Sequence, residues 1–216
     1  YTLSLHDALP ISLTQFHKKN ILDTAEKLFS EKGIRQTTMD DIAKAADYSK
    51  STIYVYFQSK DEIYNHIIYG HMCRLKDALA ECIREAPDLE HRYFLICEKL
   101  SRFYEQYPLY FSSILGNIPV DDQALAGSEI LRLLYDVGED INDCILELFR
   151  QGIREGSLPS SIPVLPSAFT LWASLGSLIP MAYEKECYLI KRLNMDKTEF
   201  LQHGFRMLLR SLKEDC

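Results

Sequence analysis

Residues 37–60 read TTMDDIAKAADYSKSTIYVYFQSK, and this stretch decides the expected fold. It predicts two short helices joined by a tight turn. Thr37 or Thr38 is the candidate N-cap of the first helix, because a hydroxyl there accepts from the free amides of the first turn. Ser49 is the candidate N-cap of the second helix. Asp47 stands between the two helices, and aspartate tolerates the left-handed backbone of a turn better than most residues other than glycine.

The outward face of the second helix carries the candidate contacts. Ile53 and Phe57 recur at helical spacing and are expected to face the interior. The other side chains offer hydroxyls and one ammonium: Lys50, Ser51, Thr52, Tyr54 and Tyr56. Such groups bind phosphates and base edges, and two short helices with a tight turn are typical of a helix-turn-helix that lays its second helix in the DNA major groove. Taken one by one, these residues also fit a solvated helix start with core tyrosines.

Lys60 begins a further helix, for which Ser59 is the candidate N-cap. A cation in the first turn opposes the helix dipole, and a phosphate partner would explain its position. We therefore expect Lys60 to contact the DNA backbone.

Residues 21–63 resemble the N-terminal domain of the TetR family of transcriptional regulators (TetR/AcrR-like). The segments that carry the resemblance are ILDTAEKLFSEKG (21–33), TTMDDIAKAA (37–46), SKSTIYVYF (49–57) and SKDEI (59–63). The resemblance implies a three-helix DNA-binding domain. It places these residues at the family's usual DNA-contact positions: Thr38, Ser49, Lys50, Ser51, Thr52, Tyr54, Tyr56 and Lys60. Asp47 stands where the family usually has a turn glycine, and Ser51 replaces a common glycine or proline.

Beyond this motif the chain is expected to be helical almost throughout, so the predicted fold is all-α, with no alternating strand pattern. Residues 12–60 form the expected DNA-binding domain and residues 61–216 a helical regulatory and dimerisation domain. Prolines, glycines and caps predict helices at 61–85, 89–106, 109–115, 129–155, from about 167, and 197–212, a first helix ending at Gly33, and a polar loop at 119–127.

Charge is divided unevenly along the chain. The 216 residues carry a net charge of −7, which by itself argues against general affinity for nucleic acid. Residues 12–60 nevertheless contain 8 basic and 6 acidic side chains, whereas residues 61–216 contain 16 and 24. An acidic body repels phosphates, so DNA is expected to bind only the first segment.

Residues 156–183 contain no charged side chain, although they are long enough in principle to span a bilayer. Prolines interrupt the beginning of this stretch, so we expect a loop followed by a single helix. A helix that is apolar on nearly all sides is expected where two subunits pack together, and we favour this over a membrane span. The resemblance to the family supports the same interpretation, with a homodimer formed by helices near 167–190 and 197–212.

The family resemblance also implies a ligand pocket in the second domain. The aromatic or apolar side chains proposed to line it are Met72, Phe103, Tyr104, Tyr107, Phe111, Tyr135 and Trp172. The expected function is a homodimeric repressor that binds a near-palindromic double-stranded operator and releases it when an unidentified small apolar or aromatic effector binds. Core packing is the alternative role for each aromatic residue.

A second hypothesis is a helical ligand-binding protein or enzyme that acts through a cavity in the C-terminal domain. Against it, the six histidines form no His-x-x-x-His pair, and the chain has no glycine-rich phosphate loop or nucleophile elbow. We therefore expect no catalytic residue, no metal and no cofactor. The six cysteines form no C-x-x-C pair and follow no signal peptide, so we expect reduced, mostly buried thiols in a cytoplasmic protein.

The first residues, YTLSLHDALPI, match one translated reading frame of a common sequencing-library adapter. We interpret residues 1–11 as an assembly artefact, with a natural flexible tail as the alternative, and give them no functional role.

Overall fold

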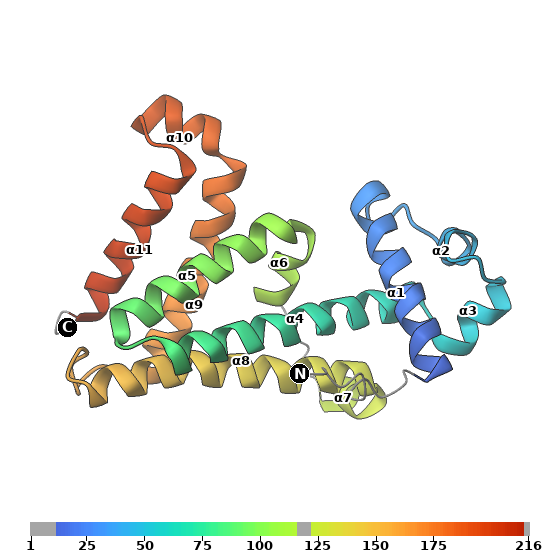
Figure 1. Cartoon of the computed structure of the whole chain (residues 1–216), viewed down its shortest axis with the longest axis horizontal. Helices are drawn as coiled ribbons and strands as arrows, with labels where there is room; N and C mark the ends of the chain where they lie inside the picture. The colour runs from blue at the N-terminus through green and yellow to red at the C-terminus, as the bar shows by residue number, and fades with distance from the viewer. Residues whose placement is uncertain (1–11, 116–121, 214–216) are drawn as a thin grey trace, which may run out of the picture. The chain divides into compact units, whose positions relative to one another are not determined.

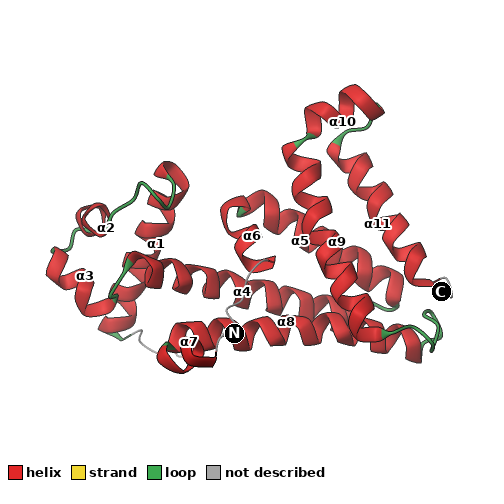
Figure 2. Cartoon of the chain, turned by 180° about the vertical axis from the view of Figure 1, so that it is seen from behind, coloured by secondary structure: helices red, strands yellow, loops and turns green. Residues whose placement is uncertain are grey.

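The computed structural model describes residues 12–115 and 122–213, and the expectation for residues 1–11 lies outside this range. Within the described ranges every regular element is an α-helix (Figures 1 and 2), which confirms the all-α prediction. The helices are α1 (Leu13–Lys32), α2 (Met39–Ala45), α3 (Lys50–Tyr56), α4 (Lys60–Glu85), α5 (Leu89–Gln106), α6 (Pro108–Leu115), α7 (Asp122–Gly127), α8 (Glu129–Arg154), α9 (Val164–Glu184), α10 (Glu186–Leu193) and α11 (Lys197–Lys213).

The chain forms two compact units, residues 1–67 and residues 68–216. The division falls after Ile67, inside α4, whereas the sequence suggested a boundary at residue 60. Helix α4 is therefore continuous from one unit into the other.

The first unit is a three-helix domain extended by the beginning of α4. Its interior is formed by one apolar residue or more from each helix: Ile21, Ala25 and Phe29 of α1, Ile42 of α2, Ile53 of α3 and Ile63 of α4, with Phe57 directly after α3. Each of these side chains is at most 1% exposed, so the predicted inward positions of Ile53 and Phe57 are confirmed. Gly33 ends α1 with a positive φ of 83°, as expected for a glycine after a helix.

In the second unit, α9 packs against both α8 and α11, and α5 packs against α6, α8, α9 and α11. Polar contacts also join its helices, and two of them come from neighbouring residues of α5. The buried Tyr93 hydroxyl on α5 donates to the Phe205 carbonyl oxygen on α11 at 2.8 Å. The buried Arg92 guanidinium donates to both carboxylate oxygens of Glu155, at 2.6 and 3.0 Å, directly after α8.

One helix boundary and two additional helices in the second unit differ from the sequence prediction. Helix α9 begins at Val164 and not near residue 167. Pro166 lies in its first turn, where the N–H groups have no carbonyl partner within the helix, so the missing N–H of proline breaks no helical hydrogen bond. Residues 122–127 of the expected polar loop form α7, and α10 was not predicted. Pro119 lies outside the described residues.

Helix α9 is long and apolar enough to cross a membrane by length and composition alone. Only 22% of its most apolar window is buried within the chain. One such helix is weak evidence for a membrane span, since a subunit interface has the same composition.

Five free cysteines lie in the described residues, and Cys216 lies outside them. Only Cys82 and Cys97 are buried, so the expectation of mostly buried thiols is wrong for this set. Burial raises the pKa of Cys97 to about 12, which keeps this thiol protonated and unreactive at neutral pH.

Candidate nucleic-acid interface

The caps of α2 and α3 form as the sequence predicted. Thr38, and not the buried Thr37, is the N-cap of α2. Its hydroxyl accepts from the Asp41 amide at 3.1 Å, and the Asp41 carboxylate accepts from the Thr38 amide at 3.0 Å, completing a capping box. The Ser49 hydroxyl caps α3 by accepting from the Thr52 amide at 3.1 Å.

The turn between α2 and α3 depends on Asp47. This residue has a φ of 62°, the left-handed conformation that the sequence predicted for it. The Tyr48 amide donates to the Ala43 carbonyl oxygen at 2.9 Å, which closes the turn and directs the chain into α3. The departure from glycine therefore leaves the helix-turn-helix geometry intact.

Three hydroxyls gather at the beginning of α3. Ser49 Oγ lies 2.8 Å from Ser51 Oγ and 2.7 Å from Thr52 Oγ1. Ser49 and Ser51 are exposed and Thr52 is half-buried. The structure thus brings together three of the predicted contact residues as a small group of donors and acceptors that can rotate to suit a partner.

Lys50 is exposed beside these three hydroxyls, but its ammonium already forms an ion pair with Asp40. Lys50 Nζ lies 2.7 Å from Asp40 Oδ1, and both side chains are more than half exposed. The hydrogen bond to this carboxylate raises the pKa of Lys50. A phosphate would have to compete with Asp40 for the same ammonium.

Tyr54 is exposed, whereas Tyr56 is half-buried against α1. The centre of the Tyr56 ring lies 5.6 Å from that of His17. His17 Nδ1 also shares a 2.6 Å hydrogen bond with the Tyr48 hydroxyl. Tyr56 therefore has a packing role at the end of α3 in addition to the expected DNA contact.

Lys60 is half-buried, and its ammonium points to the connection between α1 and α2. It donates to the Ile34 carbonyl oxygen at 2.7 Å and to the Thr37 carbonyl oxygen at 2.8 Å. The Ser59 hydroxyl accepts from the Glu62 amide at 3.1 Å, so the predicted cap of α4 is confirmed. Two of the three N–H donors of Lys60 thus have partners within the protein.

Val55 was missed by the sequence interpretation. It lies on α3 and is 75% exposed, the most exposed of the large apolar side chains in the described residues. The missed signal is its position between two tyrosines on the predicted outward face. An exposed apolar side chain on a recognition helix can contact a thymine methyl group.

Comparison with known proteins agrees with a helix-turn-helix in this part of the chain. Residues 21–67 match the family model described as bacterial regulatory proteins, tetR family. The biofilm operon icaADBC negative transcriptional regulator IcaR of Staphylococcus aureus is 35% identical over 134 residues, spanning 55% of this chain and 69% of IcaR. The chain belongs to the TetR family of transcriptional regulators. Its relatives are DNA-binding regulators and not enzymes.

One further sequence relative and two solved structures are similar to the chain at lower identity. The HTH-type transcriptional regulator YhgD of Bacillus subtilis is 25% identical over 154 residues, which span 71% of this chain and 78% of YhgD. The fatty acid degradation regulator FadR from Bacillus halodurans superposes with a TM-score of 0.69 at 19% identity, covering 92% of this chain and 97% of FadR. FadR from Bacillus subtilis, solved with stearoyl-CoA, has a TM-score of 0.66 at 16% identity and covers 88% of this chain and 97% of that chain.

In this TetR-family chain, four of the seven residues expected to line a ligand pocket form one aromatic cluster. The ring of Phe103 lies 5.2 Å from that of Tyr107 and 6.4 Å from that of Phe111. The Tyr104 ring is 5.0 Å from that of Phe111. Phe103, Tyr104 and Phe111 are buried, and Tyr107 is half-buried. Their present role is packing between α5 and α6.

His71 of α4 lies within this cluster, although the sequence interpretation did not select it. Its ring stacks on Tyr110 at 4.8 Å and lies 4.3 Å from the Tyr107 ring. Its neighbour Met72, another of the residues expected to line the pocket, is buried. No local signal marked His71, because these ring contacts join α4 to residues that lie more than thirty positions later in the sequence.

Tyr104 is the polar member of the cluster. Its hydroxyl donates to Glu184 Oε1 at 3.0 Å. Burial, together with this hydrogen bond, raises the pKa of Tyr104 to about 12, so the hydroxyl stays protonated at neutral pH. Tyr104 is therefore a constant hydrogen-bond donor at the end of α9.

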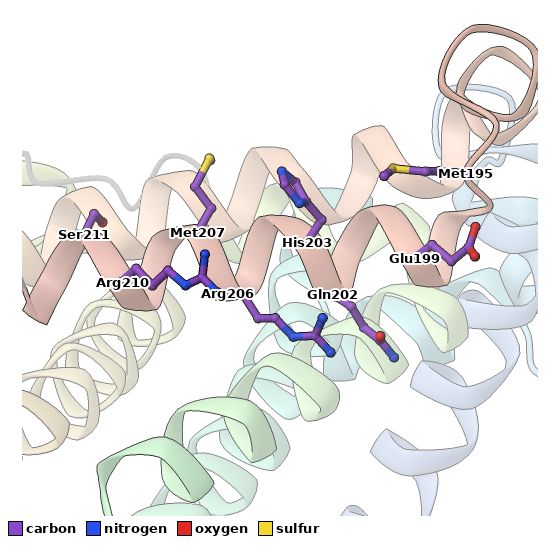
Figure 3. A pocket seen from close by; sticks show the side chains of 8 residues that line it. All are labelled: Met195, Glu199, Gln202, His203, Arg206, Met207, Arg210 and Ser211. Atoms are coloured by element: carbon purple, nitrogen blue, oxygen red, sulfur yellow. The ribbon is translucent and has the colours of Figure 1, made fainter.

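Trp172 and Tyr135 are half-buried and have no ring contact with this cluster among the aromatic pairs of the described residues. Trp172 lines a separate hollow of about 10 Å³ between α8 and α9, too small to hold a ligand. A larger hollow of about 640 Å³ lies along α11 (Figure 3), and its lining side chains come from this helix and from Met195. Because all of them except Met195 project from α11, this hollow is a surface groove.

Proposed function

We propose that the chain is a homodimeric repressor that binds a near-palindromic DNA operator and releases it when a small apolar or aromatic ligand binds the unit formed by residues 68–216. The observation that carries the DNA-binding proposal is the exposed face of α3. Hydroxyls, an ammonium and an apolar side chain lie together there on a helix held by a capped turn. IcaR is described as a negative regulator, which supports repression.

The proposed DNA contacts are of two kinds: contacts with the phosphate backbone and contacts with base edges. Lys50 and the hydroxyl group of Ser49 are expected to bind phosphates, since these groups recognise charge and lone pairs without reading sequence. Thr52, Tyr54 and Val55 are expected to face base edges. Thr38 and Ser51 are exposed at the beginnings of α2 and α3. They are expected to contact the DNA backbone and so to fix the position of the protein on the duplex. We include Tyr56 for its place at the end of α3, and we propose a different role for Lys60 below.

The exposed stripe of α9 supports the proposed dimer. Leu165 and Phe169 are 56 and 52% exposed and lie one turn apart on the same face of α9, and Met181 farther along the helix is 40% exposed. A stripe of this kind on a helix without charged residues before Glu184 is the surface that a second copy would bury. Helix α11, which packs on α9, is the other proposed interface helix.

A bound effector would act by its differential affinity for two conformations of the dimer. The aromatic cluster around His71 is the proposed ligand region, and it would have to open to admit a ligand. Because stearoyl-CoA was solved with one structural relative, long-chain acyl-CoA compounds belong in the first set of ligands to assay. We place this activity in the cytoplasm, where bacterial DNA is found.

The decisive experiment is selection of bound duplexes from a random DNA pool. A dimer with two recognition helices selects two inverted half-sites with centres separated by about one helical turn, or 10–10.5 base pairs, or a multiple of it. Recovery of a single half-site, or of no sequence preference, would contradict the proposal.

A further inference from the structure

We infer that Lys60 is a positioning residue for DNA binding, which ties the beginning of α4 to the connection between α1 and α2, and not primarily a phosphate contact. This inference rests on the proposed DNA-binding role of α3. It concerns how the recognition unit is held in its binding conformation.

Lys60 occupies an electrostatically unfavourable position in α4. It is the first residue of α4, where the helix dipole is positive and disfavours a cation. Its ammonium lies 2.7 Å from the Ile34 carbonyl oxygen and 2.8 Å from the Thr37 carbonyl oxygen. Two charge-assisted hydrogen bonds to carbonyl dipoles offset the unfavourable helix position without any DNA present.

The two carbonyl groups that Lys60 binds belong to the connection between α1 and α2. Ile34 and Thr37 lie in the connection between Gly33, which ends α1, and Thr38, which caps α2. Thr37 is fully buried, and its hydroxyl donates to the Gly33 carbonyl oxygen at 2.9 Å. The connection is thus closed on itself by Thr37 and held to α4 by Lys60.

The hydrogen bonds of Lys60 also affect the recognition helix α3. Thr38 follows the bonded Thr37 carbonyl directly, so the tie fixes the point at which α2 begins. Helices α2 and α3 pack on each other and are joined by the tight turn at Asp47. Fixing the beginning of α2 therefore fixes the pair, and release of the ammonium would free the pair relative to α1 and α4.

A phosphate contact and a positioning contact have different salt dependences. A lysine that binds a phosphate releases about one counterion, so its loss lowers the slope of log affinity against log salt concentration by about one unit. A lysine that orders the free protein has no counterion to release on binding. Its loss lowers the affinity at every salt concentration and leaves the slope unchanged.

The test compares Lys60→Met and Lys60→Arg with Lys50→Met, using the full chain and the duplex selected from the random pool. We expect Lys60→Met to lower affinity about tenfold or more with an unchanged salt slope, because two charge-assisted bonds are lost. Lys60→Arg should retain most of the affinity, since a guanidinium also donates to two carbonyls. Lys50→Met should lower the slope by about one unit.

Amide hydrogen exchange supplies a readout without DNA. In Lys60→Met, the hydrogen-bonded amides of Gly33 and Thr38 should exchange faster than in the wild type, and in Lys60→Arg they should remain protected. A lowered salt slope in Lys60→Met, unchanged affinity, or unchanged exchange of these amides would overturn the inference. If the wild type selects no duplex, the proposed function fails, whereas the exchange measurement still tests the tie.

Discussion

At the scale of single residues, the ion pair between Lys50 and Asp40 sets up a competition on the proposed DNA face. The pair is exposed, so its carboxylate also repels an approaching phosphate. Asp40→Asn should therefore raise affinity for operator and random DNA by a similar factor of a few, measured by fluorescence anisotropy at low salt. Asp23→Asn is the matched control, because Asp23 pairs with Lys19 at 2.6 Å on the exposed surface of α1. An equal gain from both substitutions would show that only the net charge matters.

The contact between Arg92 and Glu155 makes a second residue-scale prediction, which concerns stability. Hydrogen bonds from Arg92 hold the pKa of Glu155 below its ordinary value of 4.5. A carboxylate with a lowered pKa in the folded state stabilises the fold above its ordinary pKa, and this contribution is lost as the pH falls through the folded-state value. Glu155→Gln should therefore lower stability by about 1–2 kcal/mol at neutral pH, since Arg92 stays buried without its counterion.

The pH dependence of this difference is the measurement. Urea unfolding of the wild type and of Glu155→Gln should give curves that converge at pH values below about 4.5. A difference that persists unchanged into acid would show that the glutamine is destabilising for a reason other than lost charge.

At the scale of elements, the close packing of α9 on α11 depends on Gly204. A Cβ atom at this position would lie 2.6 Å from Cδ2 and 3.0 Å from Cδ1 of Leu178. Gly204→Ala should therefore lower stability by about 1–2 kcal/mol, because overpacking outweighs the gain in helix propensity. Gly70→Ala is the matched control: its Cβ would meet no atom within 4 Å, so it should stabilise the protein.

A double substitution separates packing from propensity at the same position. In a Leu178→Ala background the space is open, and Gly204→Ala should then increase the melting temperature. If Gly204→Ala has the same effect in both backgrounds, the close contact between these two helices does not limit stability.

The elements also show what the sequence could predict. Caps are local, so Ser49 and Ser59 could be assigned from neighbouring letters, and the cap of α2 could be limited to Thr37 or Thr38. The left-handed Asp47 could be predicted in the same way. The beginning of α9 could not, because Pro166 reads as a helix breaker unless its place in the first turn is known. The contacts of Lys60 depend on carbonyl groups at Ile34 and Thr37, which the chain brings near only after folding.

The ligand region marks a further limit of sequence interpretation. Phe103, Tyr107 and Phe111 could be selected as apolar or aromatic residues at helical spacing. Whether such side chains line a cavity or fill it depends on the packing of several helices, and here they fill it. The place of His71 among them follows from tertiary contacts between α4 and α6 that have no signature in local sequence.

At the scale of the whole molecule, dimerisation and operator affinity should fail together. Phe169 lies in the exposed stripe of α9 and has no charged neighbour within that helix before Glu184. Phe169→Glu would place two carboxylates in the proposed apolar interface, where burial of unpaired charge is strongly unfavourable. We expect a monomer by sedimentation. Affinity for the full operator should fall roughly a hundredfold or more, because the second head loses its high effective concentration.

Binding to an isolated half-site distinguishes this mechanism from damage to the DNA-binding unit. Phe169→Glu should bind a half-site as well as the wild type does, since α3 is unchanged. Leu95→Glu supplies the control: Leu95 is 37% exposed on α5, outside the proposed interface, and this variant should remain a dimer with wild-type affinity. A Phe169→Glu protein that stays dimeric would move the interface elsewhere. A monomer with full operator affinity would show that each head binds independently, and the near-palindromic operator would then have no physical basis.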